Sequence, residues 1–178
     1  MIKASNAIRT ARLLLNTPYS EMDCIRLIVM IIRRTAGGDT EYRCEGTNWL
    51  WRSIKNSSKY RHLIWQQEST TGAKAGMLAF KRDGDDVHHV GIVTEKGTVI
   101  HSSSVYGRVV ETPLDNSWHL LAQHKLIDSA EAVQTDQPPA NDAEEDEYDP
   151  GDLPAYTSLT RSDGVTILLA GSWRVAND

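Results

Sequence analysis

The sequence predicts an α+β domain in which N-terminal helices pack on an antiparallel sheet of about five strands. Two patterns lead to this prediction. Apolar residues recur at helical spacing over residues 7–54, whereas β-branched residues separated by glycine turns dominate residues 75–127. The length of 178 residues leaves room for one ordinary domain and an appendage, because domains usually have about 100–150 residues.

Two helices are predicted in the N-terminal part of the chain. Residues 7–15 place apolar side chains at helical spacing, and Ser5 or Asn6 is available as the N-cap. Residues 24–34 form the second predicted helix, which has Asp23 as its N-cap and glycines beyond its end. Because this helix is apolar on nearly every side, we expect it at the centre of the domain.

The remainder of the domain is predicted to be mostly strand. Residues 47–54 suit a short helix or an aromatic-rich loop equally well. Residues 118–127 fit a fifth strand or a helix, and we favour the strand. An antiparallel meander is predicted before them, because β-branched segments alternate with Asp-Gly, Lys-Gly and Tyr-Gly turns. Its strands are residues 77–81, 89–94, 98–103 and 108–112.

The chain is predicted to divide into three parts. Residues 1–128 form the domain of helices and sheet. Residues 129–154 contain an acidic run and almost no large apolar side chain, so we expect an acidic flexible linker. Residues 155–178 are predicted to form a C-terminal β-hairpin with its turn at residues 162–164. About two dozen residues cannot build their own core, so this appendage docks on the domain or associates with a protein partner or another copy.

Composition and charge exclude several classes of function. The formal net charge is −5, so the chain lacks the basic excess that drives binding to nucleic acid. The longest apolar run is interrupted by Arg26 and is far shorter than the roughly 20 residues that span a bilayer, so no membrane insertion is expected. Neither metal-ligand spacing nor a phosphate-binding glycine loop occurs, and we expect no metal and no other cofactor. No signal peptide is apparent, and we expect synthesis in the cytoplasm.

A candidate nucleophile stands at the start of the second predicted helix. Cys24 directly follows the N-cap Asp23, and the positive end of the helix dipole is expected to lower the pKa of its thiol. The other cysteine, Cys44, lies in a predicted loop without a surrounding pattern, and we interpret it as an inert thiol. Two cysteines are too few for a disulfide-stapled scaffold.

A thiolate nucleophile also needs a base and a polar group that orients the base. His89 begins one predicted strand and His101 ends the next. Folding about the turn between them brings position 91 opposite position 101, so His89 lies diagonally across from His101, within roughly 7 Å. The adjacent His88 faces the other side of the sheet. By themselves, these residues also fit a buried structural cysteine with two hydrogen-bonded histidines.

Several other side chains have two interpretations. Trp49, Trp51 and Trp65 fit the wall of a sugar or peptide site as well as they fit a hydrophobic core. Ser102 follows His101 and either helps to hold a substrate or simply ends a strand. We interpret the remaining histidines of the domain as surface or packing residues: His62, His119 and His124.

Five segments occur in an order and spacing that resemble a known family. They are Thr17-Pro18-Tyr19, Asp23-Cys24, Gly76-Met77-Leu78-Ala79-Phe80, His89-Val90-Gly91-Ile92-Val93 and Val99-Ile100-His101-Ser102. Across about residues 7–127 the chain resembles the NlpC-type cell-wall cysteine peptidases, members of the papain-like superfamily related to the CHAP amidases. The resemblance implies a papain-like cysteine peptidase fold over residues 1–128.

The resemblance also implies a thiol protease that hydrolyses peptidoglycan stem peptides, often at a γ-D-glutamyl bond to a diamino acid. Cys24 corresponds to the nucleophile, His89 to the general base and His101 to the residue that orients the base. Tyr19 and the backbone N–H of Cys24 correspond to the oxyanion region. The other candidate substrate-binding residues are Asp23, Ser102 and Trp49.

The sequence departs from the family pattern at several positions. Ile25 and Arg26 replace the usual Ser-Gly after the cysteine, Met77 replaces an aspartate, and the loop between Tyr19 and Cys24 is short. These changes indicate a divergent branch, such as one from a phage or prophage. Such an enzyme would reach the cell wall through host lysis or within a particle.

Two rival functions stay open at the level of sequence. One is a CHAP-like amidase or an acyltransferase that acts on another amide or ester with the same residues. The other is a catalytically silent module that binds the wall or builds a phage structure.

Overall fold

The computed structural model describes residues 1–129 and, as backbone, the strands 156–160 and 166–170. The chain divides into two compact units, Met1–Asp136 and Gln137–Asp178. In the second unit, β9 (Tyr156–Thr160) pairs antiparallel with β10 (Thr166–Ala170), as expected for a hairpin. The predicted hairpin turn and nearly all of the predicted linker lie outside the described residues, so the division into domain, linker and appendage stays a prediction.

The first helix, α1 (Ala4–Leu13), begins earlier than predicted. Lys3 is its N-cap, without a side-chain cap bond, and the predicted caps Ser5 and Asn6 lie inside the helix. The reason is a pairing that is distant in sequence. Strand β1 (Ile2–Lys3) pairs in parallel with β8 (Ile127–Asp128), and this contact fixes the chain immediately before α1.

The central helix α2 (Cys24–Arg34) has the predicted bounds. The Asp23 carboxylate accepts a hydrogen bond from the backbone N–H of Arg26 at 2.8 Å, which confirms Asp23 as the N-cap. Residues 47–54 form a helix, as one of the two interpretations expected. It consists of α3 (Thr47–Arg52) followed by the 3₁₀ turn η1 (Ser53–Lys55).

The main sheet has six antiparallel strands in the order β2-β7-β3-β4-β5-β6, whereas about five strands were predicted. The meander is confirmed, and residues 118–127 do contain a strand, β7. The strand that the sequence did not predict is β2, which pairs with β7 at the edge of the sheet. The bounds are β2 (Leu63–Gln67), β3 (Leu78–Asp83), β4 (Asp86–Val93), β5 (Thr98–Ser103), β6 (Arg108–Pro113) and β7 (Leu120–His124).

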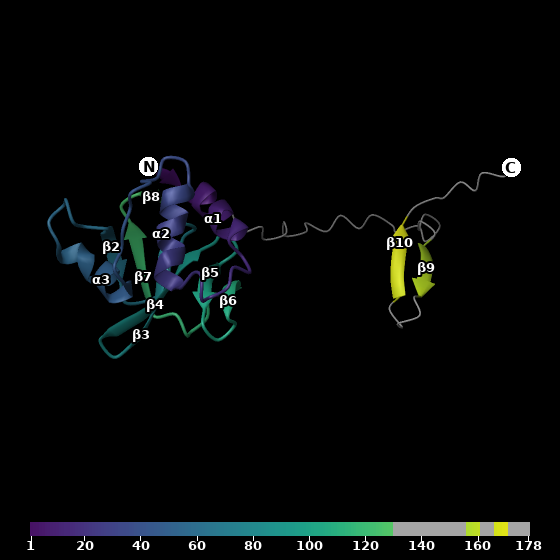
Figure 1. The fold of residues 1–178 in the computed structure, drawn as a ribbon. Helices are drawn as coiled ribbons and strands as arrows, with labels where there is room; N and C mark the ends of the chain where they lie inside the picture. Colours follow the sequence, from purple (N-terminus) through teal and green to yellow (C-terminus); the bar gives the residue numbers. More distant parts are fainter. Residues whose placement is uncertain (130–155, 161–165, 171–178) are drawn as a thin grey trace, which may run out of the picture. The chain divides into compact units, whose positions relative to one another are not determined.

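The main core lies between the helices and one face of the sheet. Figure 1 shows α1 and α2 side by side on this face, with α3 nearer the other edge. Besides Cys24, four residues of α2 are buried in the main core: Leu27, Ile28, Ile31 and Ile32. The opposite face of the sheet carries a smaller apolar cluster that includes Val93, Val99 and Trp118. The two histidines of the candidate site lie on this second face, as shown below.

Gly91 permits the close approach of β5 to β4. A Cβ atom at this position would lie 2.5 Å from Val99 Cγ1 and 2.9 Å from His101 Cβ. Gly91→Ala is therefore expected to lower the free energy of unfolding by about 1–3 kcal/mol, since both neighbours belong to a packed strand and cannot move freely. Gly46→Ala is the matched control, because nothing lies within 4 Å of that position. Thermal unfolding of both variants checks this, and equal midpoints would contradict the packing argument.

Candidate active site

Cys24 lies at the first position of α2 and is 7 % exposed. Its sulfur is 3.8 Å from Oγ1 of Thr47, at the start of α3. The backbone N–H groups of Val90 and Ile25 also favour the thiolate form. The sulfur therefore lies against β4, beside the residue that follows His89.

His89 and His101 contact each other across neighbouring strands. Nε2 of His89 lies 2.8 Å from Nδ1 of His101, and Nε2 of His101 lies 3.1 Å from Oγ1 of Thr112 on β6. The predicted register holds, because Gly91 pairs with His101. The three side chains form one hydrogen-bonded row across β4, β5 and β6.

An irregularity in β4 separates the two adjacent histidines. Lys81 pairs with His89 while Arg82 pairs with Val87, so His88 is an extra residue in this strand. Such a bulge turns the chain locally and re-aims side chains. His88 is exposed, whereas His89 is half-buried and directed at His101.

The hydrogen bond to His101 uses Nε2 of His89 and leaves Nδ1 as the nitrogen that could exchange a proton with a thiol. Within residues 1–129 no hydrogen bond joins Cys24 to His89. The structure thus brings His89 and His101 together, whereas the described contacts of Cys24 do not include either imidazole. Cys24 lies against the backbone next to His89, and His89 is bonded to His101.

Trp118 and Lys81 complete the surroundings of the histidine pair. The Trp118 ring centroid lies 5.6 Å from that of His89 and 5.2 Å from that of His101. Nζ of Lys81 lies 4.7 Å above the Trp118 ring and donates to the Ser117 hydroxyl at 2.8 Å. A positive charge is therefore fixed beside both imidazoles.

These surroundings favour uncharged forms of all three candidate catalytic groups. Burial, and then the neighbouring His101 and Lys81, lower the pKa of His89 to about 3. Burial and Lys81 lower the pKa of His101 to about 4. Burial also raises the pKa of Cys24, although the hydrogen bond from Thr47 opposes the shift. The expected lowering of the Cys24 pKa is therefore wrong, because burial outweighs the stabilisation of the thiolate at the helix N-terminus.

The raised pKa makes a testable prediction about thiol labelling. In a Cys44→Ala protein, the rate of alkylation of Cys24 should reach half its maximum above the ordinary cysteine pKa, since only the thiolate reacts. Thr47→Val should move this midpoint higher, because it removes a hydrogen bond that favours the thiolate. Iodoacetamide labelling followed by mass spectrometry over a pH series measures both. A midpoint near neutral pH would contradict the burial argument.

The predicted substrate-binding residues are placed in different ways. Tyr19 lies near Cys24. Burial raises the pKa of the Tyr19 phenol most, and the negative charge of a Cys24 thiolate raises it further. The Asp23 carboxylate is occupied as the helix cap. Ser102 is fully buried and donates to the backbone carbonyl of Met22, so it fixes the loop before the cysteine. Trp49 is partly buried at α3.

Trp49 packs away from the histidine pair, against another polar cluster. Its ring centroid lies 4.6 Å from that of His62. The Tyr42 hydroxyl bridges Nδ1 of His62 at 3.1 Å and Nε2 of His124 at 2.9 Å. His124 is completely buried, in agreement with a packing role. Cys44 is half-buried, and burial raises the pKa of its thiol to about 11, as expected of an inert thiol.

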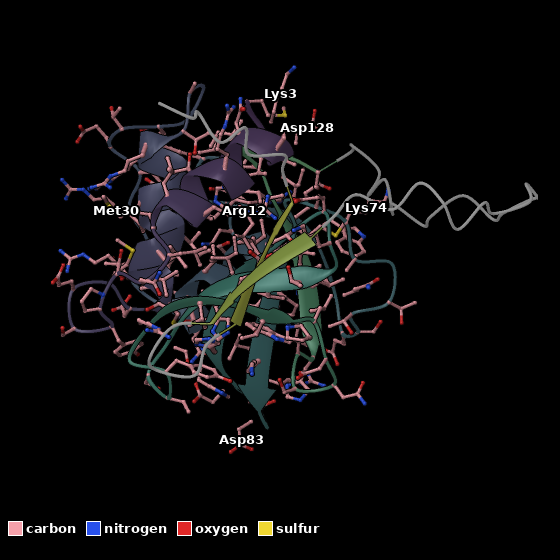
Figure 2. The ribbon with its side chains drawn as sticks, turned by 90° about the vertical axis from the view of Figure 1, so that its right-hand side faces the viewer. Lys3, Arg12, Met30, Lys74, Asp83 and Asp128 are labelled. Carbon is pink, nitrogen blue, oxygen red and sulfur yellow. The ribbon has the colours of Figure 1, made fainter. Side chains whose placement is uncertain are left out.

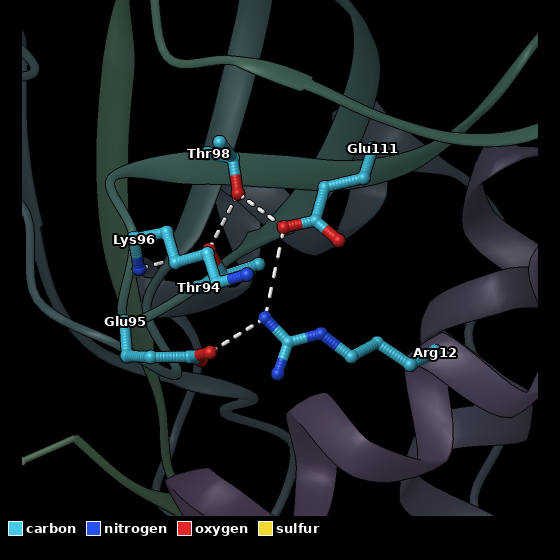
Figure 3. A network of polar contacts seen from close by, with 6 residues as sticks. All are labelled: Arg12, Thr94, Glu95, Lys96, Thr98 and Glu111. Atoms are coloured by element: carbon cyan, nitrogen blue, oxygen red, sulfur yellow. Dashed lines mark hydrogen bonds and ion pairs between the residues drawn. The ribbon is translucent and has the colours of Figure 1, made fainter. Parts of the chain in front are cut away.

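A charge network supports β6, the strand that carries Thr112. Figure 3 shows Arg12 of α1 reaching toward Glu95 and Glu111. The guanidinium lies 2.6 Å from the Glu95 carboxylate and 3.6 Å from that of Glu111. Glu111 also accepts a hydrogen bond from Thr98 at 2.5 Å. The network ties α1 to the turn between β4 and β5 and to β6, which holds Thr112 against His101.

Sequence reasoning missed three residues of the site: Thr47, Thr112 and Trp118. No local motif marks them, because each meets the site only through tertiary packing. The position of Thr112 could have been inferred from the register of the meander. In the residues with a described placement, no group of three or more His, Cys, Asp or Glu side chains could hold a metal ion. None of the helices described is long and apolar enough to cross a membrane.

Three solved structures are similar to this chain. An NlpC/p60 family protein from Bacillus cereus has a TM-score of 0.51 at 20% identity, covering 69% of this chain and 40% of that protein. RipB, a peptidoglycan hydrolase from Mycobacterium tuberculosis, has a TM-score of 0.49 at 18% identity, covering 67% of this chain and 63% of that protein. The NlpC/p60 domain of the peptidoglycan hydrolase SagA has a TM-score of 0.47 at 19% identity, covering 67% of this chain and 97% of that domain. This chain thus spans less than two thirds of the first two proteins.

The likeness to the Bacillus cereus protein establishes the fold. At 20% identity it does not extend to activity, so the predicted α+β papain-like fold of the NlpC/p60 type is what the comparison confirms. No protein-family model matches the chain, and no curated protein matches it.

Proposed function

We propose that this protein is a cysteine hydrolase that cleaves amide bonds in the stem peptides of bacterial peptidoglycan. The observation that carries the proposal is the 2.8 Å contact between His89 and His101, with Cys24 at a helix N-terminus against the same strand. A thiol, a base and a group that orients the base are the components of nucleophilic catalysis by cysteine. The choice of substrate follows from the resemblance of the sequence to the NlpC-type cell-wall peptidases, and the fold agrees with that resemblance.

The proposed reaction proceeds through a thioester. As the Cys24 sulfur attacks the carbonyl carbon, Nδ1 of His89 takes the thiol proton. The C–N bond then breaks, and His89 returns this proton to the leaving amine. Water next attacks the thioester carbonyl while His89 accepts one of its protons. The C–S bond then breaks, the sulfur recovers its proton from His89, and the carboxylic acid product leaves and ionises. Because the resting groups are uncharged, the proton transfer accompanies attack and does not precede it.

The remaining residues have supporting roles in this proposal. His101 holds Nε2 of His89, and Thr112 holds His101, so the base keeps one ring orientation. The backbone N–H of Cys24 and the hydroxyl of Tyr19 stabilise the oxyanion.

Digestion of purified peptidoglycan tests the proposal. The full chain should release peptide fragments whose masses correspond to cleavage within the stem, and a defined muropeptide should show which bond is cut. A γ-D-glutamyl bond to a diamino acid is expected. Fragments cut between sugar and peptide would favour the CHAP-like amidase, and acyl transfer to another acceptor would favour the acyltransferase. Intact peptidoglycan would contradict hydrolysis.

A silent wall-binding or phage structural module is the second candidate. It is favoured by one observation, the lack of a hydrogen bond between Cys24 and His89 within residues 1–129. The two candidates differ in thiol reactivity toward an electrophilic stem-peptide analogue. An enzyme should form a covalent adduct on Cys24 at a rate that saturates with analogue concentration. In a silent module, Cys24 should react no faster than Cys44.

A further inference from the structure

A second cavity lies outside the candidate catalytic cluster. It has a volume of about 310 Å³ and lies between the end of α3, η1, the edge strand β2 and the turn from β3 to β4. Pockets for small molecules usually have about 300–1,000 Å³, so this one suits a single ring more than an extended chain. Figure 2 shows Asp83, which precedes the turn at this cavity, at the opposite end of the domain from Lys3 and Asp128.

One residue of the cavity lining has a buried polar atom without a hydrogen-bond partner in the described residues. Oε1 of Gln66 is buried and makes no hydrogen bond with any residue in the described part of the chain. Gln66 pairs with Ala122, which belongs to the main core, so both side chains face the helices. A buried carbonyl oxygen without a donor is unfavourable. Gln66 lines the cavity, and a rotation of its amide group would present this oxygen to a ligand N–H or O–H.

The charges around the cavity are suited to an anion. Arg52 and Lys55 line it and make no ion pair within residues 1–129. Arg82 is paired with Glu68 at 3.1 Å, and Asp85 is the other carboxylate of the lining. Three cations and two carboxylates leave one positive charge, on a chain whose net charge is −5. A carboxylate on the ligand would be held by Arg52 and Lys55.

An aromatic side chain forms the apolar part of the wall. Trp51 lines the cavity and is held against Phe80 of the core, with ring centroids 5.3 Å apart and planes at 62°. Its position is therefore fixed before a ligand binds. An apolar ring surface, an acceptor for an amide N–H and a pair of cations correspond to the three chemical parts of an acidic N-acylated sugar.

We propose that this cavity binds an acidic N-acylated sugar of the peptidoglycan glycan strand. The inference rests on the proposed function and names a second part of the same substrate. The distances agree with one substrate reaching both places. Helix α3 begins at Thr47, the partner of the Cys24 sulfur, and ends at Arg52 in the cavity. These two residues are separated by about 8 Å along the helix axis.

The test measures sugar binding separately from cleavage. The probe is a peptide-free disaccharide of N-acetylglucosamine and N-acetylmuramic acid, titrated calorimetrically into full-length Cys24→Ala protein. Chitobiose, which has no carboxylate, is the matched ligand. The muramic disaccharide should bind at least tenfold more tightly than chitobiose. Equal affinity for both sugars, or no binding of either, would overturn the proposal.

Variants of the cavity connect this binding to the named residues. Arg52→Glu combined with Lys55→Glu should weaken disaccharide binding at least tenfold. Lys59→Glu combined with Lys74→Glu makes the same total charge change at exposed lysines outside the cavity lining and should not. Gln66→Leu should weaken binding of both sugars, and Arg52→Glu alone replaces the double variant if the latter does not fold. Undiminished binding by all cavity variants would refute the site.

Cleavage by the wild-type chain distinguishes this inference from the proposed function. The double variant should raise KM for a glycan-linked muropeptide and leave KM for the free stem peptide unchanged. Cleavage of both substrates by the double variant with unaltered KM would contradict the sugar site and leave the proposed hydrolase function intact. Binding of the disaccharide without any cleavage would keep the sugar site and remove the hydrolase.

Discussion

Cys24→Ala is expected to abolish the release of stem-peptide fragments, with kcat/KM reduced at least about 10³-fold. The substitution removes the only atom that can form the thioester, and no other thiol lies in the described part of the site. The protein should remain folded, because alanine is a good helix former and the contacts of the lost sulfur are weak, such as the 3.8 Å contact with Thr47. Peptidoglycan digestion with mass analysis of the products measures the loss.

Cys44→Ala is the matched control for this experiment. Cys44 is half-buried, its sulfur donates to the Gly46 carbonyl at 3.7 Å, and its side chain also interacts with that of Tyr42. This variant should keep wild-type activity within about threefold. Residual cleavage by Cys24→Ala at the wild-type rate would exclude Cys24 as the nucleophile. Equal losses in both variants would point to a general effect on folding.

Local signals in the sequence predicted the central parts of the fold. Asp23 as N-cap, followed by an apolar run interrupted only by Arg26, gave the correct bounds of α2. Two β-branched segments around a Lys-Gly turn gave the pairing of Gly91 with His101. In both cases the residues that determine the structure are close together in the chain, so propensity and turn geometry suffice.

Pairings between distant segments could not be predicted in this way. Strand β2 has no clear alternation of buried and exposed residues, and its register shifts between Leu63 and Trp65. It is a strand because β7, nearly sixty residues later, offers it a free edge. The two-residue strand β1 likewise exists only through β8, and it moved the start of α1 ahead of the predicted caps.

The same limit applies to the candidate site. The contact between His89 and His101 could be foreseen, since it follows from neighbouring strands. Thr47 approaches the sulfur from a different helix, and its role has no signature in the sequence. The direction of the Cys24 pKa depends on burial by the whole domain, which outweighs the local effect of the helix N-terminus.

His89→Gln is expected to lower kcat by about 10²–10⁴-fold, the usual contribution of a general base. Glutamine can still donate to Nδ1 of His101, but it cannot accept a proton from the thiol. His101→Asn should lower kcat less, by about 10-fold to 100-fold, because His101 acts on the base only through its 2.8 Å contact. Initial rates on a defined muropeptide measure both. A larger loss from His101→Asn than from His89→Gln would reverse the two assigned roles.

The pH dependence of the wild-type enzyme tests the same base independently. Catalysis requires the neutral imidazole, and protonation of His89 is delayed until far below neutrality because its pKa is lowered to about 3. Activity should therefore stay level through the range in which an ordinary histidine titrates and fall only in stronger acid. Lys81→Met removes a nearby positive charge, so it should move the acid limb of kcat/KM to higher pH. A wild-type acid limb near pH 6.5, unmoved by Lys81→Met, would show that neither burial nor Lys81 controls the base.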